Sequence, residues 1–293
     1  MELKEYLLKE LSPSTAKRYQ HDLQNFFPHL KRPGEATYQQ IMDVIGALRK
    51  KYSNPRTINR FLAAIKKYYD YLQYTGVRKD HPCKSIKLRD GKRRDIQLQD
   101  LFSTQELEVL LESKPKRKRD RKLFVIRDKL ILSLLIYQGL VRTEISLIET
   151  DDINLEEGTI TVKGDERTNK RTLPLKAKQI HLLYEYQSKE RPRSTSNKLF
   201  IGMRSEPMSS DSLARIVQGY QYLFTPEGAH SPEKTLTCQT IRMSVTRNLL
   251  KEGKDVRIVQ AYMGHKSPGT TEKYKQSHTE ELKAEIQKYH PLK

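Results

Sequence analysis

The chain has 293 residues, 36% of them hydrophobic, and its 55 Lys and Arg against 36 Asp and Glu give a formal net charge of +19. Two distant cysteines, Cys83 and Cys238, predict neither a disulfide framework nor a zinc site, and no apolar run is long enough for a signal peptide or a membrane span. The length predicts two domains. Residues 1–100 and the remainder are both basic, so we expect the protein to bind nucleic acid, either specifically or only loosely.

Residues 1–85 are predicted to form a helical domain. Ser12 and Pro13 are typical of a helix start, and apolar residues recur at helical spacing over 38–51 and again from Pro55 to Leu72. These apolar stripes predict a core. The opposite faces carry cations that could contact DNA phosphates or simply face water: Arg56, Arg60, Lys66 and Lys67.

Residues 86–100 are predicted to be a basic linker, because the helical pattern stops and apolar residues become scarce. Its cations Lys92, Arg93 and Arg94 could follow a DNA backbone. A solvated connector without that role would have the same composition.

Residues 101–293 predict a second, α+β domain. The run Leu130–Tyr137 is almost entirely apolar, which is typical of a buried helix. The period then changes to two over 153–162 and 171–175, which predicts a small antiparallel sheet. Helical spacing returns over 178–186, 210–220, 239–251 and 256–263. The fold class expected is therefore mainly α with a small antiparallel β-sheet, in two domains.

The segment from Thr237 to Tyr274 carries the chemistry. Arg242 is followed after 23 residues by His265, in the run Met263-Gly264-His265, and His265 is followed after nine residues by Tyr274, in the run Thr270-Thr271-Glu272-Lys273-Tyr274. This segment resembles the signature of the tyrosine recombinases, the phage integrase family. A lone His or Tyr would mean little, because the chain has 8 His and 16 Tyr.

The three residue types suit phosphodiester chemistry. A guanidinium offers planar, permanently charged donors to a phosphoryl group, and a Tyr hydroxyl needs nearby positive charge or a base because its ordinary pKa is near 10. The resemblance implies that Tyr274 attacks the phosphorus to give a 3′-phosphotyrosine, with Arg242 and His265 as catalytic partners. No metal, ATP or other cofactor is then needed, because the bond energy is kept.

The resemblance extends over nearly the whole chain. It implies that the first domain is a core-binding (SAM-like) clamp on double-stranded DNA and that residues 137–145 form the box holding the family's first catalytic Arg. It also implies a catalytic lysine near the turn of the hairpin at 160–175. A C-terminal tail helix at His278–Tyr289 would join protomers into a homo-tetramer on DNA. We expect a cytoplasmic, nucleoid-associated protein without membrane contact.

Three positions depart from the family pattern. The first catalytic Arg falls on Val141, and Arg142 lies one residue later, a rotation of about 100° on a regular helix. Arg142 could still replace it as a catalytic residue if the backbone there is not regular helix, and would otherwise be a surface Arg. Gln239 stands where the family usually has His. It can donate a hydrogen bond to a phosphoryl oxygen but cannot exchange protons at neutral pH, which leaves His265, solvent or no group as general base. Both Lys163 and Lys170 are candidates for the lysine that protonates the leaving oxygen, with Lys170 favoured.

The function predicted is therefore a site-specific DNA recombinase that integrates or excises a mobile element. The alternative, motivated by Val141 and Gln239, is a catalytically impaired DNA-binding accessory protein of the same fold. A helix-turn-helix regulator would account for the charge but not for the 23- and nine-residue spacings. A topoisomerase acting on nonspecific DNA is an enzymatic neighbour of the first prediction.

Overall fold

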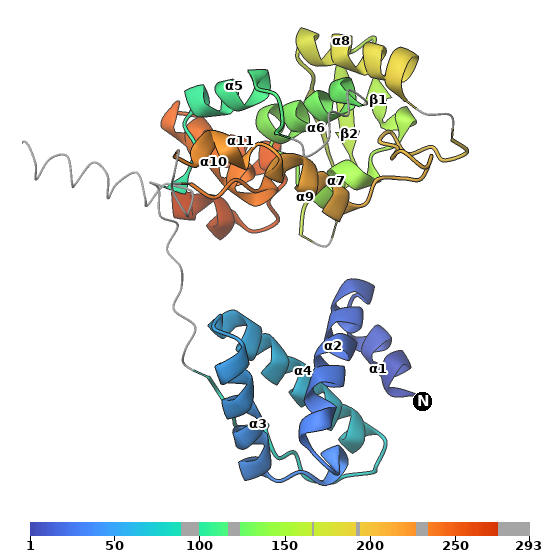
Figure 1. Cartoon of the computed structure of the whole chain (residues 1–293), viewed down its shortest axis with the longest axis vertical. Coiled ribbons are helices and arrows are strands. Elements are labelled where there is room, and N and C mark those ends of the chain that lie inside the picture. Colours follow the sequence, from blue (N-terminus) through green and yellow to red (C-terminus); the bar gives the residue numbers. More distant parts are fainter. Residues whose placement is uncertain (89–99, 117–123, 166, 192–193, 227–233, 275–293) are drawn as a thin grey trace, which may run out of the picture. The chain divides into compact units, whose positions relative to one another are not determined.

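The computed structural model describes residues 1–88, 100–116, 124–165, 167–191, 194–226 and 234–274. The chain divides into two compact units, Met1–Arg94 and Asp95–Lys293, and each is described by itself (Figure 1). This confirms the two-domain, mainly helical fold class with a small sheet. The predicted linker cations Lys92, Arg93 and Arg94 and the predicted tail helix lie outside the described residues.

The first unit is built from four helices. They are α1 (Leu3–Glu10), α2 (Pro13–Phe26), α3 (Tyr38–Lys51) and α4 (Pro55–Tyr74). Thr37 caps α3 by accepting a hydrogen bond from the Gln40 N–H, and Asn54 caps α4 ahead of Pro55, which satisfies backbone donors that helix starts leave open. The apolar faces of all four helices meet in one core. The sequence predicted this for α2, α3 and α4, whereas α1 was not predicted.

The second unit surrounds one buried helix, α6 (Val125–Tyr137), which is apolar on nearly every side. Helices α5 (Thr104–Glu112), α8 (Ala177–Glu185) and α10 (Cys238–Lys251) pack against it (Figure 1). The other α-helices among the described residues of this unit are α7 (Arg142–Leu147), α9 (Ser210–Gln218), α11 (Val256–Met263) and a short stretch at 268–274. Helix α6 begins five residues before the predicted start. Three charged residues, Arg127, Asp128 and Lys129, interrupt the apolar pattern there, and Arg127 pairs with Asp128 inside the protein.

The sheet has three antiparallel strands in the order β1 (Ile153–Asn154), β2 (Thr159–Val162) and β3 (Arg171–Pro174). Its register places Ile160 opposite Leu173 and Val162 opposite Arg171. Alternation along β3 buries Arg171 and Leu173 on one face and exposes the residues between them. A cation thus takes an inward position that would ordinarily be apolar.

No helix in the described parts of the chain is both long and apolar enough to cross a membrane.

Candidate active site

Arg242 lies on α10, whose start is capped by Thr237. Its side chain is buried and donates to two backbone carbonyls, from Nη1 to Gly139 O at 2.6 Å and from Nη2 to Met263 O at 2.6 Å. These carbonyls lie at the ends of α6 and α11, where helices leave oxygens without partners and carry partial negative charge. Burial lowers the pKa of Arg242 to about 10, so the guanidinium stays charged at neutral pH.

His265 follows the end of α11. Gly264 ends that helix with φ +69°, a left-handed conformation that favours glycine, and turns the chain toward the hairpin, where His265 bridges to Thr168. The buried ring has its Nδ1 2.8 Å from the hydroxyl oxygen of Thr271. This hydrogen bond fixes the orientation of the imidazole and leaves Nε2 for another partner.

Tyr274 ends the described chain and lies in a helical stretch, residues 268–274, one turn after Thr271. Its ring is buried. Burial raises the pKa of Tyr274 to about 12, although the positive charge of Arg242 opposes the rise. The phenol is therefore protonated at neutral pH and must lose its proton to become a nucleophile. The fold thus gathers Tyr274, Arg242 and His265 in one place, while their catalytic roles stay a prediction.

A pH-dependent stability follows from His265. Burial first, and then the charges of Arg242 and Arg171, lower its pKa to about 4 from an ordinary 6.5. The folded state therefore binds fewer protons than the unfolded state below pH 6.5. As the pH falls from 6.5 to 4, we expect the native state to lose about 3 kcal/mol through this group, with no contribution above pH 7.

Thermal melting from pH 7.5 to 4 of the wild type and of His265→Asn measures this effect. The stability difference between the two proteins should change steadily over that window. His181→Asn is the matched control, because the His181 side chain is 71% exposed. An unchanged difference between wild type and His265→Asn across the window would refute a neutral, buried His265.

Two further charged residues, Arg171 and Glu144, lie beside the site and were not predicted from the sequence as site residues. Arg171 on β3 makes a two-pronged ion pair with Glu144 on α7, at 2.7 and 3.0 Å, and both side chains are buried. The signal that could have found Arg171 is its position, two residues before Leu173, on the inward face of a predicted strand.

Val141 and Arg142 lie where α7 begins. Val141 is the N-cap residue with extended backbone, and Arg142 opens the helix, so the chain is not regular helix at this step. The Arg142 side chain is 45% exposed and pairs with Asp211 on α9 at 3.0 Å. Its role as a replacement for the missing first Arg stays a prediction.

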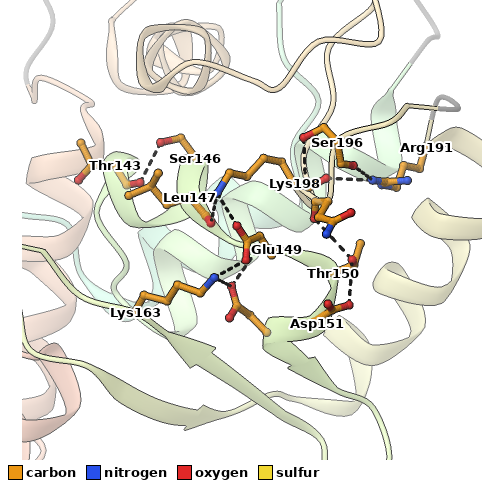
Figure 2. Close-up of polar contacts among 12 residues, drawn as sticks. Thr143, Ser146, Leu147, Glu149, Thr150, Asp151, Lys163, Arg191, Ser196 and Lys198 are labelled. Atoms are coloured by element: carbon orange, nitrogen blue, oxygen red, sulfur yellow. Dashed lines mark hydrogen bonds and ion pairs between the residues drawn. The ribbon is translucent and has the colours of Figure 1, made fainter.

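The other predicted catalytic residues lie in different surroundings. Gln239 is exposed near the start of α10. Figure 2 shows the Lys163 ammonium directed at Glu149, and Asp152 lies 3.7 Å from it. Both partners raise the pKa of Lys163, and the hydrogen bond with Glu149 contributes most. Lys170 is exposed, one residue after Asn169, whose N–H donates to Gly264 O at 2.9 Å.

In the first unit, three of the four cations predicted to bind DNA have internal partners. Arg60 on α4 donates to both carboxylate oxygens of Asp22 on α2, at 2.6 and 2.9 Å. Lys66 donates to backbone carbonyls at Lys84 and Ile86, and Lys67 pairs with Glu10 and Asp70. Arg56 is exposed in the first turn of α4.

The fold and the site together define a tyrosine recombinase. The phage integrase family model matches residues 92–281, and the model of the phage integrase N-terminal SAM-like domain matches residues 2–76. The chain belongs to the phage integrase family.

Relatives and solved structures match over most of the chain. Tyrosine recombinase XerD of Oceanobacillus iheyensis is 28% identical over 96% of this chain and 93% of its own length, and XerD of Listeria innocua is 27% identical over 97% and 94%. A Tn1549 transposon integrase structure aligns with TM-score 0.67 at 15% identity, covering 94% and 95% of the two chains. A lambda integrase structure aligns with TM-score 0.66 at 15% identity, covering 90% and 89%. These two structures show a shared fold.

Proposed function

We propose that this site-specific recombinase cleaves and rejoins duplex DNA through Tyr274. The observation that carries the proposal is the meeting of Tyr274, Arg242 and His265 in one buried, positively charged place. The spacing of these residues along the chain and their proximity in the fold are independent of each other. Both support a site for a backbone phosphate.

Charge balance supports an anionic substrate. Arg242 and Arg171 are two buried guanidiniums, and Glu144 is the carboxylate that pairs with Arg171. The Nη atoms of Arg242 donate to neutral carbonyls, so neither is hydrogen-bonded to a carboxylate, while the charges of Glu144 and Asp165 raise the pKa of this guanidinium without forming an ion pair with it in the described part of the chain. A buried charge is costly unless it is compensated, and a phosphodiester carries the single negative charge that would compensate it.

The reaction that these groups support is a transesterification. The Tyr274 oxygen attacks the phosphorus, the bond to the 5′-oxygen breaks, and a 3′-phosphotyrosine forms. His265, neutral at pH 7, takes the phenolic proton, and Arg242 stabilises the charge on the phosphoryl oxygens. The leaving 5′-oxygen receives a proton from a lysine.

Lys170 is favoured for that last role over Lys163. Its neighbours Thr168 and Asn169 contact His265 and Gly264, whereas the ammonium of Lys163 is engaged by Glu149 and Asp152. A proton donor must reach the scissile phosphate. Lys170 lies on the segment that contacts the His265 turn, so it is better placed than Lys163 to reach a phosphate bound there.

Double-stranded DNA is the proposed partner. The lambda integrase neighbour was solved as a dimer bound to a core site, and a Tn1549 transposon integrase was solved with DNA. We extend this to a clamp by both units and to a homo-tetramer joined by the tail at 278–289. Integration or excision of a mobile element stays a prediction, as does nucleoid association. An impaired accessory protein is not favoured, since the matched relatives are recombinases over nearly the full chain.

Trapping the covalent intermediate tests the proposal. A duplex bound by the full chain is first selected from a randomised library and then remade as a nested set carrying one nick at each position. A nick close to the cleavage point releases the short strand and traps the adduct. We expect a covalent protein–DNA adduct without added metal or ATP, and mass spectrometry after nuclease digestion should find the nucleotide on Tyr274. Specific binding without an adduct from any nicked duplex would instead support the accessory protein.

A further inference from the structure

Arg171 is the strongest feature of the second unit that the proposed chemistry leaves unused. It lies on β3 with a buried guanidinium, and its Nη atoms hold Glu144 at 2.7 and 3.0 Å. Replacing a buried ion pair by apolar residues often stabilises a protein, so such a pair is weak support for a purely structural role. Its Nε–H is also the one buried side-chain donor or acceptor without a partner in the described chain.

The guanidinium of Arg171 lies directly against the turn that carries His265. A Cβ added at Gly264 would come within 2.5 Å of Nη1 and 2.9 Å of Cζ, so any larger residue there would displace the guanidinium of Arg171. The hairpin segment that precedes β3 makes two further contacts with this turn, the Thr168–His265 bridge and the hydrogen bond from Asn169 N–H to Gly264 O. Three contacts, at Thr168, Asn169 and Arg171, thus join the hairpin to one short turn.

The same guanidinium acts electrostatically on the other site residues. Its charge lowers the pKa of His265 and of Arg242, and the charge of Glu144 opposes both effects. On balance the pKa of Glu144 is lowered, because hydrogen bonds and the charge of Arg171 outweigh the rise caused by burial. Glu144 is therefore ionised, and Arg171 remains held in place.

We propose that Arg171 is a positioning residue of the active site, which fixes the Gly264–His265 turn and holds a second buried positive charge beside His265 and Arg242. The chain has Val141 at the start of α7, where the first Arg of its family is expected. Arg171 on β3 supplies a positive charge beside the site in place of that missing Arg. Arg171 acts through His265 and is not required to touch the substrate. The inference rests on the proposed function only for its effect on catalysis.

The charged groups around His265 define the experiment. Besides burial, the charges of Arg242 on α10 and Arg171 on β3 lower the pKa of His265, and that of Glu144 on α7 raises it. Thr271 is hydrogen-bonded to the ring. Electrostatic interaction with Tyr274 and with Asp165 in the hairpin raises the pKa of Arg242. The pKa of His265 can be measured in the free full-length protein by NMR of labelled histidine, with the His265→Asn variant giving the assignment. This measurement needs no DNA and stays valid if the proposed function fails.

Three variants give distinct expectations. Glu144→Gln removes the opposing charge and should lower the pKa of His265. The double variant Arg171→Met with Glu144→Gln removes both charges and should raise the pKa of His265, since the charge of Arg171 has the larger effect. Arg171→Lys should keep the charge and leave the pKa near that of the wild type. Arg167 is an exposed cation in the same hairpin, so Arg167→Met is the matched control and should leave the pKa of His265 unchanged.

Adduct formation gives the second readout. We expect the rate of adduct formation to fall at least about tenfold in the double variant and to fall less in Arg171→Lys. In each variant the acid limb of the pH–rate profile should move in parallel with the pKa of His265 measured by NMR. A His265 pKa equal in the wild type and the folded double variant would overturn the inference, as would an unchanged adduct rate. If the double variant does not fold, Glu144→Gln alone gives the test. A pKa of His265 that is the same in Glu144→Gln and in the wild type would then overturn the inference.

Discussion

Replacing Tyr274 with phenylalanine is expected to abolish the covalent adduct, by at least about 10³-fold, while DNA binding stays within a few-fold of the wild type. The aromatic ring is buried, and phenylalanine keeps its apolar volume, so the packing of the last described helix is retained. The change removes only the oxygen that attacks phosphorus. Denaturing gels of the reaction with the nicked duplex, together with a binding assay on the intact duplex, measure the two effects separately.

Tyr262→Phe is the control for this substitution. Tyr262 lies on α11 in the same unit, and its hydroxyl donates to Tyr137 O at 3.0 Å. Burial raises the pKa of Tyr262 as it does that of Tyr274, yet its hydroxyl has a structural partner. Loss of this hydroxyl should lower stability slightly and leave adduct formation intact. An adduct that persists in Tyr274→Phe would mean that another residue is the nucleophile.

Replacing Arg60 with methionine is expected to destabilise the first unit by about 3–5 kcal/mol, because it strands a buried carboxylate. The Asp22 side chain is 1% exposed and the Arg60 side chain 34% exposed. Asp22→Asn should therefore cost less, about 1–2 kcal/mol, since the guanidinium left behind can reach water. Hydrogen exchange of the peptides covering α2 and α4 in the full chain measures this local opening free energy.

The double variant Asp22→Leu with Arg60→Met separates the structural role from DNA contact. If the pair serves mainly to join α2 and α4, the double variant should recover most of the stability and bind DNA like the wild type. If Arg60 contacts a phosphate, as its place on a basic helix face predicted, the double variant should bind more weakly with a salt dependence reduced by about one charge. The latter result would contradict a purely structural pair.

Secondary structure was largely predictable because it is written in local periodicity. Both ends of α3 and α11 were predicted to the residue, and the change from helical to alternating spacing located the three strands. The spacing of Arg242, His265 and Tyr274 was equally local, since all three fall within 33 residues of sequence. The start of α6 was missed because three consecutive charged residues, Arg127, Asp128 and Lys129, interrupt the apolar pattern in its first turns.

Which cations work together was not predictable, because sequence holds no record of contacts between distant segments. Arg60 has the same spacing as a solvent-facing Arg, yet its partner Asp22 lies 38 residues away. Lys163 and Lys170 were both candidates by position, and only the contacts of Glu149 and of the Gly264–His265 turn distinguish their surroundings. Packing of whole helices decides such pairs.

The sequence by itself determined the helical and strand segments, the excess positive charge and the order of the three residues that match the recombinase signature. Tertiary structure decided that Arg242 meets Gly139, 103 residues away, and that Arg171 meets Glu144, 27 residues away. The reason is physical: a buried guanidinium needs acceptors in a fixed geometry, and these acceptors are brought to it only when α6, α7, α11 and β3 pack into one core.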